Sequence, residues 1–521
     1  MARKGDMMVK KQLLIWALFA LLAGCAVNPV TGRNELSLVS EQQELAIGAQ
    51  QYAPARQSQG GDYTVDQGLT VYVSQVGQKL AAVSDRRLPY EFKVINSSVP
   101  NAWALPGGKI SINRGLLTEL QSEAELAAVL SHEIVHAAAG HSARNLSQGM
   151  LLQAGVLGAA VATQGTDYAN LAQLGAGLGA QLITQKYGRD AERESDLYGM
   201  QYMVRAGYDP QGAVSLQRTF LKLSENKRQD WLSGLFASHP PSQERLQNNI
   251  ELLATLPRGG ELGVERYQAR IAHLLRTKPA YEAFDEGRKA LSQDDLAKAG
   301  RLAQKAIALE PREAHFYALM GDVEQKNQRL KAAVAQYDKA TRLNPDFFYY
   351  YLQRGKVKEK LNLAAQAKSD LERSVALLPT ADAYHSLGNL AQKAGRLHDA
   401  KAYYAKAADN QSALGRQAYA ALVDLDLQDN PAKYVSVRAG QDAQGRIVAQ
   451  VSNPTPRNIS GIVLILQFQN EAGKLQTLQR SVQGTVAAGS QQQFDLGLTG
   501  ELTPAQLKTL QVRIAGAQVA R

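Results

Sequence analysis

His132-Glu133-Ile134-Val135-His136 is the most informative stretch of this 521-residue chain. Two histidines four residues apart lie one turn above each other on the same face of a helix, so both imidazoles can reach one metal ion. The acidic and apolar residues of Glu119–Leu130, at helical spacing, predict that the helix begins upstream of the motif. Glu133 is then placed to act as general base toward a water that zinc makes acidic, as in a zinc protease.

A zinc site that keeps one position open for water needs a third protein ligand. Downstream, Arg189–Gly199 carries Glu192 and Asp196 four residues apart, again on one face of a helix. We expect Glu192 to complete a site with His132 and His136 that holds one zinc ion per chain. Asp196 can accept a hydrogen bond from the far ring nitrogen of a ligand histidine. The alternative for this segment is a solvated charged helix, which the metal motif disfavours.

The other histidines do not extend this set of ligands. His141 follows His136 by five residues and lies off its face, so we expect it to close a structural hydrogen bond rather than bind zinc. Surface or packing roles are expected for the histidines of the later segments, which are His273, His315, His385 and His398.

Four motifs in one order resemble those of the membrane-associated gluzincin metallopeptidases, the family that includes the CAAX prenyl proteases and HtpX. They are Asn101–Ile110, Gly115–Leu117, the HExxH helix and Glu192-x-x-x-Asp196, within roughly residues 35–255. Together with the repeats described below, the resemblance narrows to TPR-containing periplasmic proteases of the β-barrel assembly-enhancing type, in a lipoprotein form.

The resemblance implies a substrate-binding edge strand that pairs with the backbone of an extended, unfolded peptide. Its residues would be Asn101, Ala102, Trp103 and Ala104. The alternative is a plain loop or strand before the Pro-Gly-Gly turn that follows.

The resemblance also singles out Ser238–Leu246, in which His239 and Arg245 lie six residues apart as a family element. An imidazole can donate to an oxyanion or ligate zinc. His239 therefore either stabilises the transition state or plugs the open zinc position of a latent enzyme. An incidental histidine in a loop before a helix is the third alternative.

The N-terminus predicts export and lipidation. Basic residues precede the apolar run Leu13–Leu22, which is too short for a transmembrane helix and fits the core of a signal peptide. Leu22-Ala23-Gly24-Cys25 resembles a bacterial lipobox, which implies cleavage before Cys25 and lipidation of this single cysteine. Ala26 stands where Asp would retain a lipoprotein at the inner membrane, so we expect a periplasmic protein lipid-anchored at the outer membrane.

A 34-residue period follows the peptidase region. Gly287, Gly321 and Gly355 repeat at this interval, as do Pro311, Pro345 and Pro379. Glycine in a first helix and proline after a second helix are typical of TPR repeats, which stack into a solenoid with a concave binding face.

The last segment changes to a period of two. Arg446–Asn453, Ile462–Phe468 and Val512–Ile514 are expected to be strands of a small β-sandwich. Earlier in the chain, the Gly- and Ala-rich residues 149–183 are expected to form a pair of packed helices, or alternatively a mobile gate over the cleft.

The predicted fold class is therefore multidomain and mainly α: an α+β gluzincin zinc-peptidase domain, an α-solenoid of TPR repeats and a small C-terminal β-sandwich. The expected boundaries are a signal peptide 1–24, a peptidase domain 25–255, a linker 256–279, TPR repeats 280–425 and a β-sandwich 430–521.

The predicted function is that of a zinc metalloendopeptidase with Glu133 as base. By resemblance, it degrades misfolded or stalled outer-membrane proteins, and its TPR repeats dock the substrate or the β-barrel assembly machinery. The alternative is a TPR chaperone or assembly scaffold whose peptidase is latent. The net charge of +10 is spread without a block of Lys or Arg and gives no case for nucleic-acid binding.

Overall fold

The structure is a computed structural model, and it describes residues 25–157, 183, 186–225, 235–408, 412–470, 472–498 and 502–520. The chain divides into two compact units, which are Met1–Arg354 with Ala376–Leu378 and Gly355–Val375 with Pro379–Arg521. The expected signal peptide and most of the expected helix pair at 149–183 lie outside the described residues. The architecture is multidomain and mainly α, as the sequence predicts.

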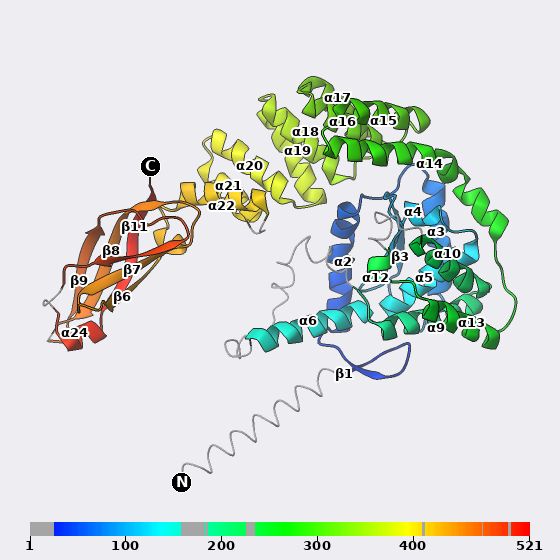
Figure 1. Cartoon of the computed structure of the whole chain (residues 1–521), viewed down its shortest axis with the longest axis horizontal. Helices are drawn as coiled ribbons and strands as arrows, with labels where there is room; N and C mark the ends of the chain where they lie inside the picture. The colour runs from blue at the N-terminus through cyan, green and yellow to red at the C-terminus, as the bar shows by residue number, and fades with distance from the viewer. Residues whose placement is uncertain are drawn as a thin grey trace, which may run out of the picture. The chain divides into compact units, whose positions relative to one another are not determined.

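The first unit opens with the part that carries the HExxH motif (Figure 1). Its elements are β1 (Cys25–Val27), β2 (Asn34–Leu36), α2 (Glu41–Ser58), α3 (Gln67–Ala81), β3 (Glu91–Ile95), β4 (Ala102–Leu105), β5 (Lys109–Asn113), α4 (Arg114–Leu117), α5 (Glu123–Ala138), α6 (His141–Leu157), α9 (Arg189–Arg205), α10 (Gln211–Glu225), α12 (Leu235–Ser238) and α13 (Gln243–Thr255).

A three-stranded sheet supports the central helix α5. Its strand order is β3-β5-β4, with β3 parallel and β4 antiparallel to β5. Both Ile110 and Ile112 of β5 are fully buried, and α5 packs against this sheet and against α3, α9 and α10. Fifteen of the sixteen residues of α5 are buried, so the motif helix is a core element rather than a surface helix.

Helix α5 begins at Glu123, later than the sequence interpretation placed it. Ser122 has an extended backbone, with φ −148° and ψ 162°, and its hydroxyl accepts a hydrogen bond from the Glu125 N–H at 3.1 Å. This is an N-cap, so the expectation that residues 119–122 are helical was wrong. The motif still lies well inside the helix.

The repeats form antiparallel helix pairs. Those of the first unit are α14 (Val264–Ser292) with α15 (Leu296–Leu309) and α16 (Ala314–Lys326) with α17 (Leu330–Leu343). A Cβ at Gly321 would lie 2.7 Å from the ring of Tyr337 on the paired helix, which explains why glycine repeats in the first helix. Helix α14 runs from the expected linker into the first repeat, and the domain boundaries remain predictions.

The second unit contains the later repeat helices and a β domain. Its helices are α18 (Phe348–Lys360, which begins in the first unit), α19 (Ala364–Leu377), α20 (Ala381–Lys393), α21 (Leu397–Ala408), α22 (Ala413–Asp426), α23 (Pro431–Tyr434) and α24 (Pro504–Lys508). Its strands are β6 (Ser436–Gln441), β7 (Ile447–Asn453), β8 (Ile459–Gln469), β9 (Leu475–Val482), β10 (Ser490–Asp495) and β11 (Gln511–Val519).

These strands form two sheets, ordered β10-β7-β6 and β11-β8-β9. Both sheets contribute side chains to one core, for example Val451 from β7 and Leu464 from β8. The domain is therefore a small β-sandwich, as expected, with three strands that the hydrophobic pattern did not reveal.

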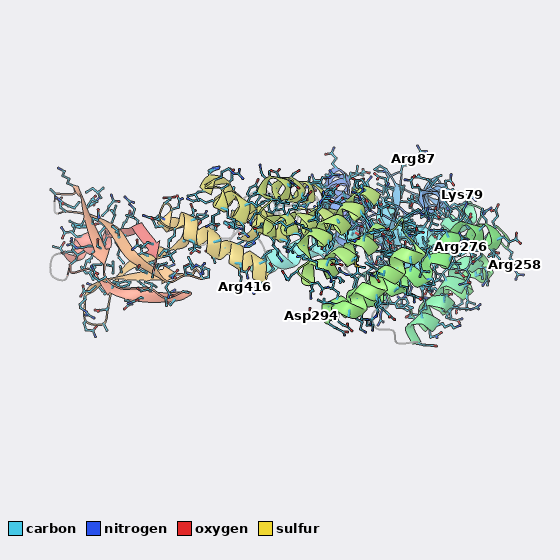
Figure 2. The ribbon with its side chains drawn as sticks, turned by 90° about the horizontal axis from the view of Figure 1, so that it is seen from above. Lys79, Arg87, Arg258, Arg276, Asp294 and Arg416 are labelled. Atoms are coloured by element: carbon cyan, nitrogen blue, oxygen red, sulfur yellow. The ribbon has the colours of Figure 1, made fainter. Side chains whose placement is uncertain are left out.

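The first unit carries exposed basic side chains on several different segments of the chain. Lys79, Arg87, Arg258 and Arg276 are exposed, and Figure 2 shows their side chains at its outer surface. Within the described part of the chain, no helix combines the length and the apolar character that crossing a membrane requires.

Glu123, in the first turn of α5, ties this helix to its neighbours. Its carboxylate accepts hydrogen bonds from Tyr72 at 2.7 Å, Tyr208 at 3.0 Å and Arg266 at 2.8 Å. Burial alone would raise the pKa of Glu123, but these donors outweigh it and hold the pKa below its usual value.

We predict that Glu123→Gln lowers the free energy of unfolding by about 1–3 kcal/mol, because a charged acceptor of several hydrogen bonds is lost. Since the pKa is depressed in the folded protein, this contribution is present at neutral pH and is lost as the pH falls through the folded-state pKa. Thermal melting at pH 7 and in acid measures it. The exposed Glu265→Gln, in the first turn of α14, is the control, and equal melting of both variants at pH 7 would contradict the prediction.

Candidate metal centre

Two packed helices carry most of the candidate site. His132 and His136 lie on α5, and Glu192 and Asp196 lie on α9. The helices approach closely at Gly199, where a Cβ would lie 3.3 Å from the backbone nitrogen of His132. Residues at i and i+4 on each helix therefore face the same space between them.

Four side chains converge at this point. Ligand atoms of His132, His136, Glu192 and His239 all lie within 4.8 Å of one another. The Nε2 atoms of His132 and His136 are 3.0 Å apart, and Glu192 Oε1 is 3.3 Å from His136 Nε2. Nitrogen and carboxylate oxygen in this number are the donors that zinc prefers.

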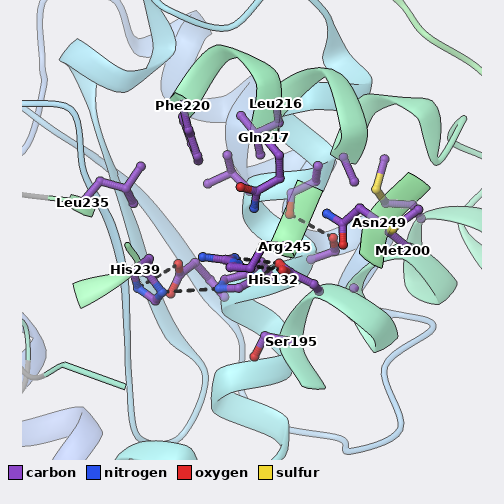
Figure 3. Close-up of a pocket in the computed structure, with 18 residues that line it drawn as sticks. His132, Ser195, Met200, Leu216, Gln217, Phe220, Leu235, His239, Arg245 and Asn249 are labelled. Atoms are coloured by element: carbon purple, nitrogen blue, oxygen red, sulfur yellow. Dashed lines mark hydrogen bonds and ion pairs between the residues drawn. The ribbon is translucent and has the colours of Figure 1, made fainter. Parts of the chain in front are cut away.

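His239 lies beside His132 at the pocket drawn in Figure 3. It directly follows α12, and its Nδ1 lies 2.8 Å from Glu192 Oε1 and 3.3 Å from His132 Nε2. His239 is 4% exposed. Its imidazole thus stands among the candidate ligands, in the position of a fourth donor.

Arg245, on α13, compensates the negative charge of α9. Its guanidinium donates two hydrogen bonds of 2.7 Å to Asp196, and its Nη1 lies 2.8 Å from Glu192 Oε2. Asp196 Oδ1 in turn lies 3.0 Å from His132 Nδ1. The arginine therefore orients the carboxylate that faces the back of a candidate ligand.

Glu133 lines the same pocket as His132 and His239. It is 1% exposed, its Oε2 has no hydrogen-bond partner, and its Oε1 lies 3.6 Å from His239 Nε2. Burial raises the pKa of Glu133, and the charges of His239 and His132 only partly oppose this. An unpartnered buried carboxylate beside nitrogen donors fits a metal site that also holds a water molecule.

The two histidines of the motif differ in proton affinity. For His132, burial favours the neutral ring, but Asp196 and Glu192 outweigh it and raise the pKa to about 10. For His136, burial dominates and holds the pKa well below its usual value. A metal ion and a proton compete for the same nitrogen of His132, so metal binding would release a proton.

The predicted substrate strand is at a sheet edge but is covered. Ala102, Trp103 and Ala104 belong to β4, the edge strand of the order β3-β5-β4, and Asn101 directly precedes it. All four are buried, at 5% exposure or less. In the described part of the chain, β4 pairs with no strand other than β5.

Two further aromatic residues lie close to the site: Tyr187, which had no signal in the sequence, and His141, for which the sequence predicts a structural hydrogen bond but not its partner. Tyr187 stacks on His136 with ring centroids 3.9 Å apart and bonds the hydroxyl of Ser142 at 2.8 Å. His141 lies behind His136, with the two Nδ1 atoms 2.8 Å apart. Neither contact follows from a spacing rule, because each depends on how α6 and the segment before α9 pack.

Comparison with known proteins decides the family. Residues 69–251 match the model of peptidase family M48, and residues 321–362 and 381–413 match models of the tetratricopeptide repeat. The mitochondrial metalloendopeptidase OMA1 of Schizosaccharomyces pombe is 30% identical over 283 residues, which cover 52% of this chain and 79% of that protein. This chain belongs to peptidase family M48. It is a metallopeptidase with TPR repeats.

Two bacterial relatives are similar over different lengths. The β-barrel assembly-enhancing protease of Yersinia pestis is 27% identical over 351 residues, covering 61% of this chain and 71% of the relative. Metalloprotease YcaL of Escherichia coli is 31% identical over 189 residues, covering 35% of this chain and 72% of the relative.

Proposed function

We propose that this M48 peptidase is a zinc metalloendopeptidase, lipid-anchored on the periplasmic side of the outer membrane, that degrades misfolded or stalled outer-membrane proteins. The observation that carries the proposal is the convergence of His132, His136, Glu192 and His239 beside the unpartnered Glu133. The name of the Yersinia pestis relative, a β-barrel assembly-enhancing protease, supports the substrate class.

In this proposal His132, His136 and Glu192 hold one zinc ion. A bound zinc ion would supply a Lewis acid that makes a water molecule nucleophilic near neutral pH. Glu133, whose pKa is raised by burial, takes a proton and returns it to the leaving amine. Asp196 keeps the His132 ring oriented, and Arg245 keeps Asp196 ionised and in place.

His239 is the resting plug of the site in this proposal. Its Nδ1 is within 3.3 Å of both His132 Nε2 and Glu192 Oε1, so it competes for the position that a substrate needs. Pro240 and Pro241 follow it and stiffen the loop. The burial of β4 agrees with a closed enzyme, since extended peptides cannot pair with a covered edge.

A second candidate function follows from the same observations. A TPR scaffold for outer-membrane β-barrels, with its peptidase latent, would also show a plugged metal centre. The repeats of the first unit form a hollow lined by Arg288, Asp322 and Tyr349, among others. In both candidates we propose that the repeats dock extended protein segments or the assembly machinery.

The proposed anchor is an acyl chain on Cys25. The backbone of this residue opens β1 and pairs with Leu36 of β2. The attachment point is thus part of a hairpin of the peptidase region.

We predict that Glu133→Gln retains zinc but lowers the turnover of an unfolded porin roughly 100- to 10,000-fold, because only the base is removed. Gel-based hydrolysis at measured zinc occupancy tests it. Equal turnover by the variant and the wild type would refute the catalytic assignment. Absence of turnover in both the wild type and the His239→Ala variant would favour the scaffold.

We predict that His239→Ala raises hydrolysis of casein and self-cleavage, because the position that the imidazole fills becomes open. An oxyanion donor would behave in the opposite way, with a loss of roughly 100- to 1,000-fold. Rates are compared at equal zinc occupancy, with the double variant Glu133→Gln/His239→Ala as the inactive control. A strong loss of activity refutes the plug.

We predict that Cys25→Ser moves the protein from the membrane fraction to the soluble fraction of cells, because the thiol that carries the acyl chain is absent. Ala26→Ser, which keeps the thiol, is the matched control. Retention of Cys25→Ser in the outer-membrane fraction after a high-salt wash would contradict the anchor.

A further inference from the structure

His141, the first residue of α6, stands directly behind the candidate ligand His136. It is 2% exposed, and the two rings meet edge to face, with centroids 4.8 Å apart and planes at 75°. Its Nδ1 lies 2.8 Å from His136 Nδ1, and its Nε2 lies 3.2 Å from Glu194 Oε1. Both ring nitrogens are therefore in use.

The positions of the hydrogens on this pair follow from the geometry. His136 turns its Nε2 toward the metal cluster, so its Nδ1 carries the hydrogen and donates to His141 Nδ1. A neutral imidazole has one donor and one acceptor. His141 must then carry its hydrogen on Nε2 and donate it to Glu194. A single arrangement satisfies all three groups, and it fixes the tautomer that lets His136 ligate a metal through Nε2.

Glu194 is held in turn by the N-terminal hairpin. The side-chain amide of Asn28 donates to Glu194 Oε1 at 2.9 Å, and Asn28 is 3% exposed. Its Oδ1 accepts from the backbone N–H groups of Val30 and Thr31, at 2.9 and 3.3 Å. The same amide also reaches Glu35 of β2. Asn28 thus shapes the turn of the hairpin and ties it to α9.

The hairpin is fixed to α6 as well. Glu35 forms an ion pair with Arg144, and the Leu38 N–H donates to the hydroxyl of Ser147 at 2.9 Å. The β1–β2 hairpin therefore bridges the helix that bears His141 and the helix that bears Glu192 and Glu194. A displacement of the hairpin would move both supports of the metal cluster.

We propose that His141, Glu194 and Asn28 form a hydrogen-bond relay that positions the metal ligand His136 and makes the N-terminal hairpin part of the support of the metal centre. This rests on the proposed assignment of His136 as a ligand. His132 and His136 are supported differently. The carboxylate of Asp196, held by Arg245, faces His132. The neutral ring of His141 faces His136 and links its position to that of the N-terminal hairpin.

Metal affinity of the metal-depleted full chain tests the relay. Zinc binding is measured against a chromophoric chelator, and the visible absorption of the cobalt-substituted protein reports the ligand geometry. His141→Phe removes both ring nitrogens and should weaken zinc binding roughly 10- to 100-fold, with an altered cobalt spectrum. His141→Asn, whose Oδ1 can still accept from His136, should recover part of the affinity.

Asn28→Asp tests whether the β1–β2 hairpin contributes to the support of the metal centre. It keeps the oxygen that shapes the turn but replaces the amide donor with a second carboxylate next to Glu194. We expect zinc binding to weaken, by less than in His141→Phe. His315→Phe is the control, because this half-buried histidine of α16 also uses both nitrogens, one toward the Gly60 carbonyl at 3.0 Å and one toward Tyr350. It should lower the melting temperature and leave zinc affinity unchanged.

The outcomes are distinct. Unchanged zinc affinity and cobalt spectrum in His141→Phe overturn the relay. Weakened binding in His141→Phe with wild-type binding in Asn28→Asp overturns the role of the hairpin. A wild type that binds no zinc overturns the metal assignment itself, before any relay is tested.

Discussion

The close packing of α5 against α9 is the constraint on which the site depends. Each helix supplies two polar side chains one turn apart, and they meet only because the helix axes approach at Gly199. A larger residue there would push against the His132 backbone. The sheet and α3 bury the opposite side of α5, and the cap at Ser122 fixes where it starts. The packing of the core therefore fixes the positions of the side chains that form the candidate metal site.

The charged side chains of the site are compatible with a bound cation. Three carboxylates, Glu133, Glu192 and Asp196, face a single guanidinium, Arg245. A buried charge is tolerated only when it is paired. Arg245 pairs with both Asp196 and Glu192, and a divalent ion that displaces the proton of His132 would add positive charge next to Glu133 and Glu192. The pKa values of His132 and His136 shift in opposite directions, because Asp196 and Glu192 outweigh burial at His132, whereas burial dominates at His136.

The sequence was sufficient for features that follow from periodicity. The four-residue spacing of the motif placed its residues on one helix face, and the 34-residue period revealed the paired helices. The polar edge strands β6, β9 and β10 were missed because most of their residues are exposed and lack an apolar alternation. The partners of His141 and Asn28 could not be predicted either. Their contacts join segments 53 and 166 residues away to Glu194, and only tertiary packing brings these together.

The strand pairing of Cys25 with Leu36 has a mechanical consequence. Only two residues separate Cys25 from the buried Asn28, a span of at most about 10 Å of extended chain. If Cys25 carries the proposed acyl chain, no long flexible linker separates the anchor from the peptidase domain. The domain would then lie close to the lipid headgroups. The distance from the bilayer at which the active site can act would then be limited to the size of the domain itself. Such an enzyme would sample polypeptides emerging at the bilayer surface and would leave those diffusing freely in the surrounding compartment untouched.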